Sequence, residues 1–123
     1  MFQNFKKQIF SYNSISINYV IGGSGPPLLL LHGYPQTYFI WHKIASELSE
    51  KYTVVASDLR GYGDSSKPNS DKKHESYSKR AMAKDQVKLM KYLGFDSFLV
   101  AGHDRGGRVG HRMALDYPGV VEK

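Results

Sequence analysis

The stretch best suited to chemistry is Gly102-His103-Asp104-Arg105-Gly106, near the end of the 123-residue sequence. Its spacing, glycine-x-nucleophile-x-glycine, is typical of a sharp strand-to-helix turn that exposes the central side chain. Such a turn strains the central backbone, and side chains at positions 102 and 106 would collide, which explains both glycines. A carboxylate suits attack on a saturated carbon, giving an alkyl ester. We therefore predict that Asp104 is the catalytic nucleophile; a helix N-cap is its alternative role.

Two arginines follow the aspartate at positions that share one helix face. Arg105 and Arg108 are three residues apart, so both side chains are expected near Asp104. A planar guanidinium group binds a carboxylate through two parallel hydrogen bonds. We predict Arg105 and Arg108 as substrate-binding residues for a small acid. The alternative is that Arg108 is an ordinary surface residue and Arg105 a structural ion-pair partner.

The elements that must position these residues follow from the apolar pattern. The continuous apolar run at 28–32 predicts a strand that is covered on both faces, and 52–58 and 97–103 are predicted as two further buried strands. Helical spacing predicts helices over 38–51, 77–94 and from 105 to just before Pro118, with Gly94 ending the second. Alternation over 8–22 predicts two antiparallel strands. The order predicts an α/β fold with a mostly parallel sheet, antiparallel edge strands and flanking helices.

The loop "LHGYPQ", residues 31–36, follows the first of the buried strands. In folds with this kind of turn, such a loop provides one of two backbone N–H donors to a developing oxyanion. We predict Tyr34 as that donor, paired with the backbone N–H of Arg105. A simple turn or a cis peptide at Pro35 is the alternative.

Four stretches together carry a family resemblance: "LLLLHGYPQTYFIW", "VVASDLRGYGDSSKP", "RAMAKDQVKLMKYLGF" and "AGHDRGGRVGHRMALDYPG". They resemble the α/β-hydrolase superfamily, and within it most closely the haloacetate (fluoroacetate) dehalogenases. The resemblance implies a hydrolase acting on carbon-halide bonds, with Asp104 displacing halide from a short 2-haloacid through a covalent ester. It also implies that arginines matching Arg105 and Arg108 hold the carboxylate of the substrate.

Members of that family are more than twice as long as this sequence. The resemblance therefore implies that residues 1–123 are the N-terminal portion of a single α/β-hydrolase core domain. The helical cap, the catalytic acid and the histidine that serves as general base are then expected to be absent, which would leave this fragment inactive alone. We also expect the strand over 97–103 to become an exposed sheet edge through which the chain self-associates.

Two other functions stay open on the sequence. One is a fragment of an epoxide hydrolase or another hydrolase with an aspartate nucleophile. Haloalkane dehalogenases and many epoxide hydrolases resemble one another in having tryptophan directly after the aspartate, whereas Arg105 stands there in this chain. The other is a small non-catalytic binding protein that uses its basic surface, since the formal net charge is +6.

Composition and motifs argue against several further classes. Much of the positive charge lies in 67–80, which reads as a solvated loop, and no nucleic-acid-binding motif accompanies it. The chain has no cysteine, its five histidines lack metal spacing, and Ser66 replaces the third glycine of a dinucleotide motif. We therefore expect no metal and no cofactor.

The sequence also predicts where in the cell the protein is found and what its remaining polar residues do. There is no secretory signal pattern, and the longest apolar run, 26–31, is too short to span a bilayer, so we expect a cytoplasmic protein without a membrane partner. His32, His103 and His111 are expected to be structural. Asp58 and Arg60 are expected to brace the loop that follows the second buried strand.

Overall fold

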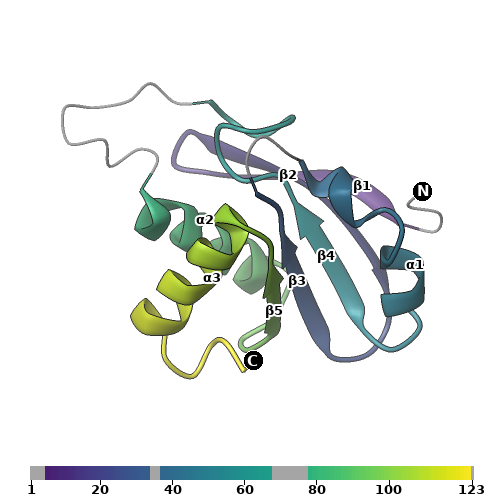
Figure 1. Cartoon of the computed structure of the whole chain (residues 1–123). Coiled ribbons are helices and arrows are strands. Elements are labelled where there is room, and N and C mark those ends of the chain that lie inside the picture. Colours follow the sequence, from purple (N-terminus) through teal and green to yellow (C-terminus); the bar gives the residue numbers. More distant parts are fainter. Residues whose placement is uncertain (1–4, 34–36, 68–77, 123) are drawn as a thin grey trace.

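The computed structural model describes residues 5–33, 37–67 and 78–122, which form one sheet flanked by helices (Figure 1). The elements are β1 (Lys6–Tyr12), β2 (Ile15–Gly23), β3 (Pro27–Leu31), the 3-10 helix η1 (Tyr38–Trp41), α1 (Ala45–Leu48), β4 (Thr53–Ser57), α2 (Lys79–Tyr92), β5 (Leu99–Gly102) and α3 (Arg105–Asp116). The strand order within the described residues is β1-β2-β4-β3-β5. β4, β3 and β5 are parallel, whereas β1 and β2 are antiparallel at one edge, which confirms the predicted α/β architecture.

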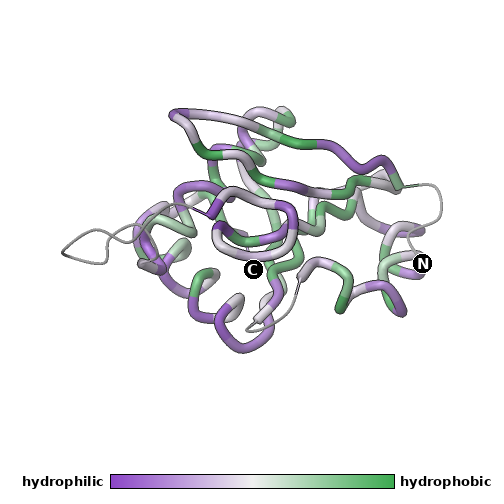
Figure 2. Tube along the Cα trace, turned by 90° about the horizontal axis from the view of Figure 1, so that it is seen from above, coloured by the Kyte–Doolittle hydropathy of each residue, from purple (hydrophilic) through white to green (hydrophobic). Residues whose placement is uncertain are grey.

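The central strand β3 is buried on both faces, as its leucine run predicted. Successive side chains of a strand point to opposite faces. Leu29 and Leu31 accordingly pack into the cluster that includes residues of α2 and α3, while Leu28 and Leu30 pack into a second cluster with η1 and α1. Hydrophobic segments are concentrated along the central strands in Figure 2. The helices therefore cover the two faces of the sheet, and the carboxyl end of β3 is held inside the molecule.

The N-terminal hairpin closes the antiparallel edge. Asn13 and Ser14 connect β1 and β2 with left-handed φ angles of 44° and 68°, as a two-residue hairpin turn requires. On β1 itself, Lys6 and Lys7 are exposed and Phe10 alone is buried. Charged residues on an edge strand disfavour pairing with another chain, so this edge is well protected.

The other edge of the sheet is formed by β5. Just before it, the Phe98 N–H donates to the Val120 carbonyl at 2.8 Å, and the Glu122 N–H donates to the Phe98 carbonyl at 2.8 Å. These residues pair in parallel and cover the beginning of the edge. Self-association through the rest of this edge stays a prediction.

The prediction of a single helix over 38–51 is wrong, because the chain forms the two short helices η1 and α1 instead. The turns of η1 are closed by backbone hydrogen bonds between residues three apart, as in a 3-10 helix. The Ile40 N–H donates to the Thr37 carbonyl at 3.2 Å, and the His42 N–H donates to the Phe39 carbonyl at 3.0 Å. The His42 ring also bonds the Phe39 carbonyl at 2.7 Å and stacks on the Phe39 ring. Side chains that bond nearby backbone groups compete with the α-helical pattern, which explains the interruption.

Helix α2 follows its prediction closely. Its cap is Ser78, whose hydroxyl accepts the Ala81 N–H at 3.0 Å, and its end is marked by Gly94 with φ 93°. Its inward face is mainly apolar but also carries Asp85, which is fully buried. Asp85 therefore needs partners within the protein.

Asp85 forms a buried ionic network with two other elements. The Arg60 guanidinium donates two hydrogen bonds to it, each at 2.6 Å, and the Tyr12 hydroxyl donates a third. Burial, followed by the hydrogen bond to Asp85, raises the pKa of Tyr12, so the phenol stays protonated. The network ties the end of β1 and the loop after β4 to α2. The predicted bracing role of Arg60 is confirmed.

We predict that Asp85→Asn lowers the free energy of unfolding by about 3 kcal/mol, because it leaves the Arg60 guanidinium buried without a counter-charge. Urea denaturation followed by circular dichroism measures the difference. The control is Asp96→Asn, at an exposed position, which should change stability by less than about 0.5 kcal/mol. Equal stability of the two variants would contradict the role of this network.

Candidate functional site

Asp104 lies at a sharp turn between β5 and α3, as predicted. Its φ of 55° and ψ of −116° place a non-glycine residue in a sparsely populated backbone region, which costs about 1–3 kcal/mol. The side chain is exposed and makes no capping hydrogen bond to α3. A helix N-cap therefore does not explain the aspartate.

The two glycines beside Asp104 are required by backbone contacts. A Cβ atom added at Gly102 would lie 2.5 Å from the carbonyl carbon and oxygen of Gly106. A Cβ atom added at Gly106 would lie 2.2 Å from the Leu31 carbonyl oxygen and 2.4 Å from that of His32. Real Cβ atoms do not approach backbone so closely, so the predicted steric reason for these glycines is confirmed.

The turn from β5 into α3, residues 102–106, is called the elbow below. The loop that follows β3 contacts it at Gly33. A Cβ atom added there would lie 2.7 Å from the Asp104 Cβ and 3.1 Å from its Oδ2. Tyr34 and Pro35 lie outside the described residues, so the oxyanion role of the Tyr34 N–H stays a prediction. The N–H of Arg105 belongs to the first residue of α3. Its oxyanion role also stays a prediction.

His32 joins this loop to the loop after β4. Its ring is fully buried, Nδ1 lies 2.7 Å from the Gly33 carbonyl oxygen, and Nε2 accepts the Leu59 N–H at 3.0 Å. Since Nε2 accepts, the proton is on Nδ1, which donates to Gly33. Burial lowers the pKa of His32 and keeps the ring neutral. Its expected structural role is confirmed.

The loop after β4 is organised around Asp58. Its carboxylate accepts hydrogen bonds from the Tyr38 N–H at 2.8 Å, the Asn18 side-chain amide at 2.9 Å and the Asp64 N–H at 3.0 Å. Gly63, with φ 52°, leaves no space for a Cβ atom, which would lie 2.2 Å from Asp58 Oδ2. The predicted bracing role of Asp58 is therefore confirmed.

Arg105 is held by a residue of that same loop. It is half-buried, and its Nη1 donates to the Tyr62 hydroxyl at 3.2 Å. The Tyr62 ring in turn packs edge-on against the His32 ring, with 5.1 Å between centroids. Sequence reasoning missed Tyr62; the signal was an aromatic residue between Gly61 and Gly63, both in left-handed conformations.

Arg108 lies one helical turn beyond Asp104 and is exposed. Lys79, at the start of α2, is a further cation and is half-buried. Burial lowers the pKa of Lys79, Arg105 and Arg108 lower it further, and Asp104 raises it. Arg105 and Arg108 both lie on the first turn of α3, directly after Asp104. Their role in binding a substrate stays a prediction.

The surroundings of the elbow are partly apolar. A hollow of about 300 Å³ beside it is lined by Ile40, Trp41, Ile44 and His103. Within residues 5–33, 37–67 and 78–122, no three acidic or histidine side chains cluster closely enough to hold a metal ion. None of the described helices is long and apolar enough to cross a membrane.

Two adjacent glycines of α3 provide a sharp test of the packing at the elbow. Gly106→Ala should destabilise the chain by more than about 3 kcal/mol, because its Cβ would collide with the backbone of β3. Gly107→Ala should be neutral or stabilising by up to about 1 kcal/mol, since the nearest atom is 3.7 Å away and alanine favours helix. Thermal or urea unfolding compares them. Similar losses in both would refute the close contact of α3 with β3.

Stability should also fall as the pH drops from about 7 to about 5. The folded-state pKa of His32 is lowered, so the unfolded chain takes up this proton first and is favoured by acid. His32→Gln removes the titration and should flatten this part of the stability profile, even if the variant is less stable throughout. His111→Gln, at an exposed position, is the control. An unchanged slope in His32→Gln would contradict the buried neutral ring.

Comparison with known proteins agrees with this geometry. Fluoroacetate dehalogenase from Burkholderia sp is 55% identical over 121 residues, covering 98% of this chain and 40% of that protein. Soluble epoxide hydrolase from Corynebacterium sp. (strain C12) is 44% identical, covering 90% of this chain and 37% of that protein. The chain thus spans about 40% of the length of these curated relatives.

Solved structures and a family model extend the comparison. A crystal structure of a protein from Nostoc sp PCC 7120, described as a candidate alpha/beta hydrolase, superimposes with a TM-score of 0.97 and 58% identity, covering 99% of this chain and 42% of that one. A family model for the alpha/beta hydrolase fold matches residues 26–123, which include the elbow and the loops beside it. The chain therefore belongs to the α/β-hydrolase family.

Proposed function

We propose that the protein is a hydrolase in which Asp104 displaces halide from a short 2-haloacid. The observation that carries the proposal is the exposed Asp104 carboxylate at the elbow, with Arg105 and Arg108 on the first turn of the helix that follows. The name of the dehalogenase relative supports the same substrate class. Because the chain spans about 40% of that relative, the activity proposed is that of the complete hydrolase.

The proposed reaction begins with substitution at the α-carbon of the acid. A carboxylate oxygen of Asp104 forms a bond to that carbon, and the carbon-halogen bond breaks with its electron pair leaving on the halide. The product is an ester between Asp104 and the 2-hydroxy acid skeleton. The N-terminus of α3 carries partial positive charge, which favours the ionised form of Asp104 that this attack needs.

The arginines are proposed to align the substrate for that attack. Arg105 is already oriented by Tyr62, so less conformational freedom is lost when it binds a carboxylate. Arg108 is exposed one turn further and gives the carboxylate a second partner. With the carboxylate held, the α-carbon of a short acid comes within reach of Asp104.

Hydrolysis of the ester requires a general base and stabilisation of an oxyanion. We propose the backbone N–H groups of Tyr34 and Arg105 for the oxyanion. His32 is unsuited as the base, because both of its ring nitrogens are engaged in hydrogen bonds and the ring is buried. We place the base in a region of the dehalogenase relative that this chain does not match. On that basis we expect residues 1–123 to be alkylated once without turnover.

Chloroacetate tests the proposal on the 123-residue chain. The chain contains no cysteine, so addition of one carboxymethyl group cannot arise from a thiol. Intact-mass spectrometry should show one such addition to the unchanged chain, and none to Asp104→Asn. The control Asp96→Asn, at an exposed position, should react like the unchanged chain.

Two outcomes would overturn this function. Equal labelling of Asp104→Asn would show that the carboxylate is not the nucleophile. Faster labelling by a neutral epoxide of similar size would favour the epoxide hydrolase relatives over haloacids.

A further inference from the structure

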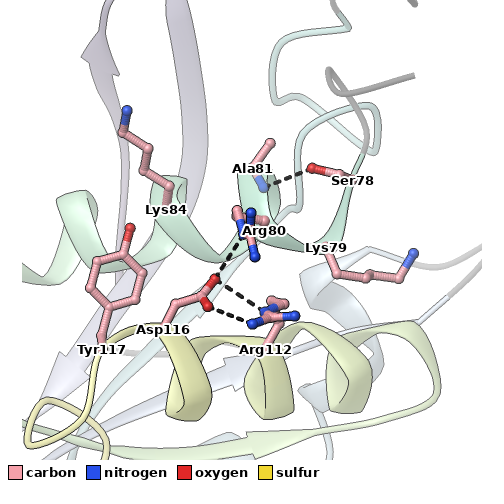
Figure 3. Close-up of a pocket in the computed structure, with 8 residues that line it drawn as sticks. All are labelled: Ser78, Lys79, Arg80, Ala81, Lys84, Arg112, Asp116 and Tyr117. Atoms are coloured by element: carbon pink, nitrogen blue, oxygen red, sulfur yellow. Dashed lines mark hydrogen bonds and ion pairs between the residues drawn. The ribbon is translucent and has the colours of Figure 1, made fainter. Parts of the chain in front are cut away.

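Two hollows adjoin each other where α2 packs against α3. The wider hollow, of about 1000 Å³, is the one drawn in Figure 3. The narrower hollow, of about 420 Å³, is lined by the residues Lys84, Val87, Lys88, Lys91, Phe95, Asp96, Tyr117 and Val120. Lys84 and Tyr117 line both hollows, so the two are continuous. Among the described residues that line them, none belongs to the elbow, so this region is separate from the site at Asp104.

The floor of the narrower hollow is apolar. It consists of four half-buried side chains, each packed against the core cluster on this face of the sheet: Val87, Phe95, Tyr117 and Val120. The core therefore fixes their positions, while part of each side chain faces the hollow. Water against apolar surface of this kind is displaced favourably by an apolar group. The floor favours a ligand with a hydrocarbon body.

The rim of the narrower hollow is basic. Lys84, Lys88 and Lys91 follow one another at spacings of four and three residues, which places them on one face of α2. All three are exposed, and none forms an ion pair with a described carboxylate. Of the described carboxylates, only Asp96 lines this hollow. Like charges at these spacings repel one another, so an anion held between them would stabilise the helix.

The wider hollow extends this positive charge. The cations that line it are Lys79, Arg80, Lys84 and Arg112. Its carboxylate, Asp116, is already engaged by Arg112 at 2.6 Å and by Arg80 at 3.3 Å. Figure 3 shows Asp116 beside these two guanidinium groups, whereas the ammonium group of Lys84 points away from it. The lysines of the rim therefore remain available for an anion from outside the chain.

We infer that the narrower hollow binds a medium-chain carboxylate, a free single-chain amphiphile whose tail lies on the apolar floor and whose carboxylate lies among the rim lysines. A volume of about 420 Å³ is in the range of sites for small organic molecules. The floor faces a hollow, which a single chain can enter and a flat membrane surface cannot. An ammonium group is a point charge, so the rim attracts the carboxylate without imposing a fixed geometry. This binding is separate from the reaction proposed at Asp104.

Octanoate tests the inference on the 123-residue chain. The dissociation constant is measured by following the backbone amide signals of residues 84–96 and 119–122 in an NMR titration, and octanoate should shift these signals. Acetate lacks the tail and should bind there at least about ten-fold more weakly. 1-Octanol lacks the charge and should bind there at least about three-fold more weakly than octanoate.

Two substitutions address the rim and the floor in turn. Lys88→Gln removes a charge of the rim and should weaken octanoate binding by about three-fold. Its matched control is Lys43→Gln, at an exposed lysine between η1 and α1, which should leave the affinity unchanged. Val87→Thr keeps the shape of the floor but adds a hydroxyl group, and should also weaken binding by about three-fold.

The same titration distinguishes the other occupants of the hollow. Equal octanoate affinity in Lys88→Gln and Lys43→Gln would overturn the inference, and so would 1-octanol that binds as tightly as octanoate. Octanoate shifts confined to residues 102–108 would place the acid at the elbow and overturn it. Signals of the hollow that move with chain concentration alone would assign it to a second copy of the chain. Binding to phosphatidylglycerol vesicles without binding of octanoate would assign the basic face to a membrane surface, and either result would overturn the inference.

Discussion

The contact between the first turn of α3 and the carboxyl end of β3 is the constraint on which the rest of the site depends. At Gly106 the two backbones are so close that an added Cβ atom would lie 2.2 Å from the Leu31 carbonyl oxygen. Only a chain without a side chain at this point turns so tightly from β5 into α3. The turn strains the backbone of Asp104 and leaves its side chain exposed. Core packing on both faces of β3 holds the other side of the contact in place.

A second set of interactions, through His32 and Tyr62, fixes the position of Arg105 beside this contact. His32 bonds to both loops at the ends of β3 and β4, and its ring supports Tyr62. Tyr62 then accepts a hydrogen bond from Arg105. The arginine beside the elbow is thus oriented from the sheet outward, and its position does not depend on a bound substrate. Such preorganisation suits the proposed role of Arg105 in aligning a small acid.

Much of this arrangement was predictable because its causes are local. The glycines at 102 and 106 indicate a tight turn by their spacing, and the leucines of 28–31 indicate a strand covered on both faces. The break between η1 and α1 was not predictable from periodicity, because it depends on the bond from His42 to the Phe39 carbonyl. This competing bond has no signature in the apolar pattern.

The contribution of Tyr62 was missed for a different reason. Tyr62 reaches Arg105 across 43 residues of sequence. Spacing along the chain carries no information on such long-range contacts. Net charge indicated a basic protein, but it did not indicate that Tyr62 would hold Arg105.

Mapping of the alkylated residue in the folded and unfolded chain tests the central claim most directly. After exposure to chloroacetate in buffer or in concentrated urea, proteolysis and tandem mass spectrometry locate the carboxymethyl group. If the tight turn creates the reactive carboxylate, Asp104 carries the label in buffer and loses it in urea. A label found on another residue, or found equally on Asp104 in both conditions, would contradict the account.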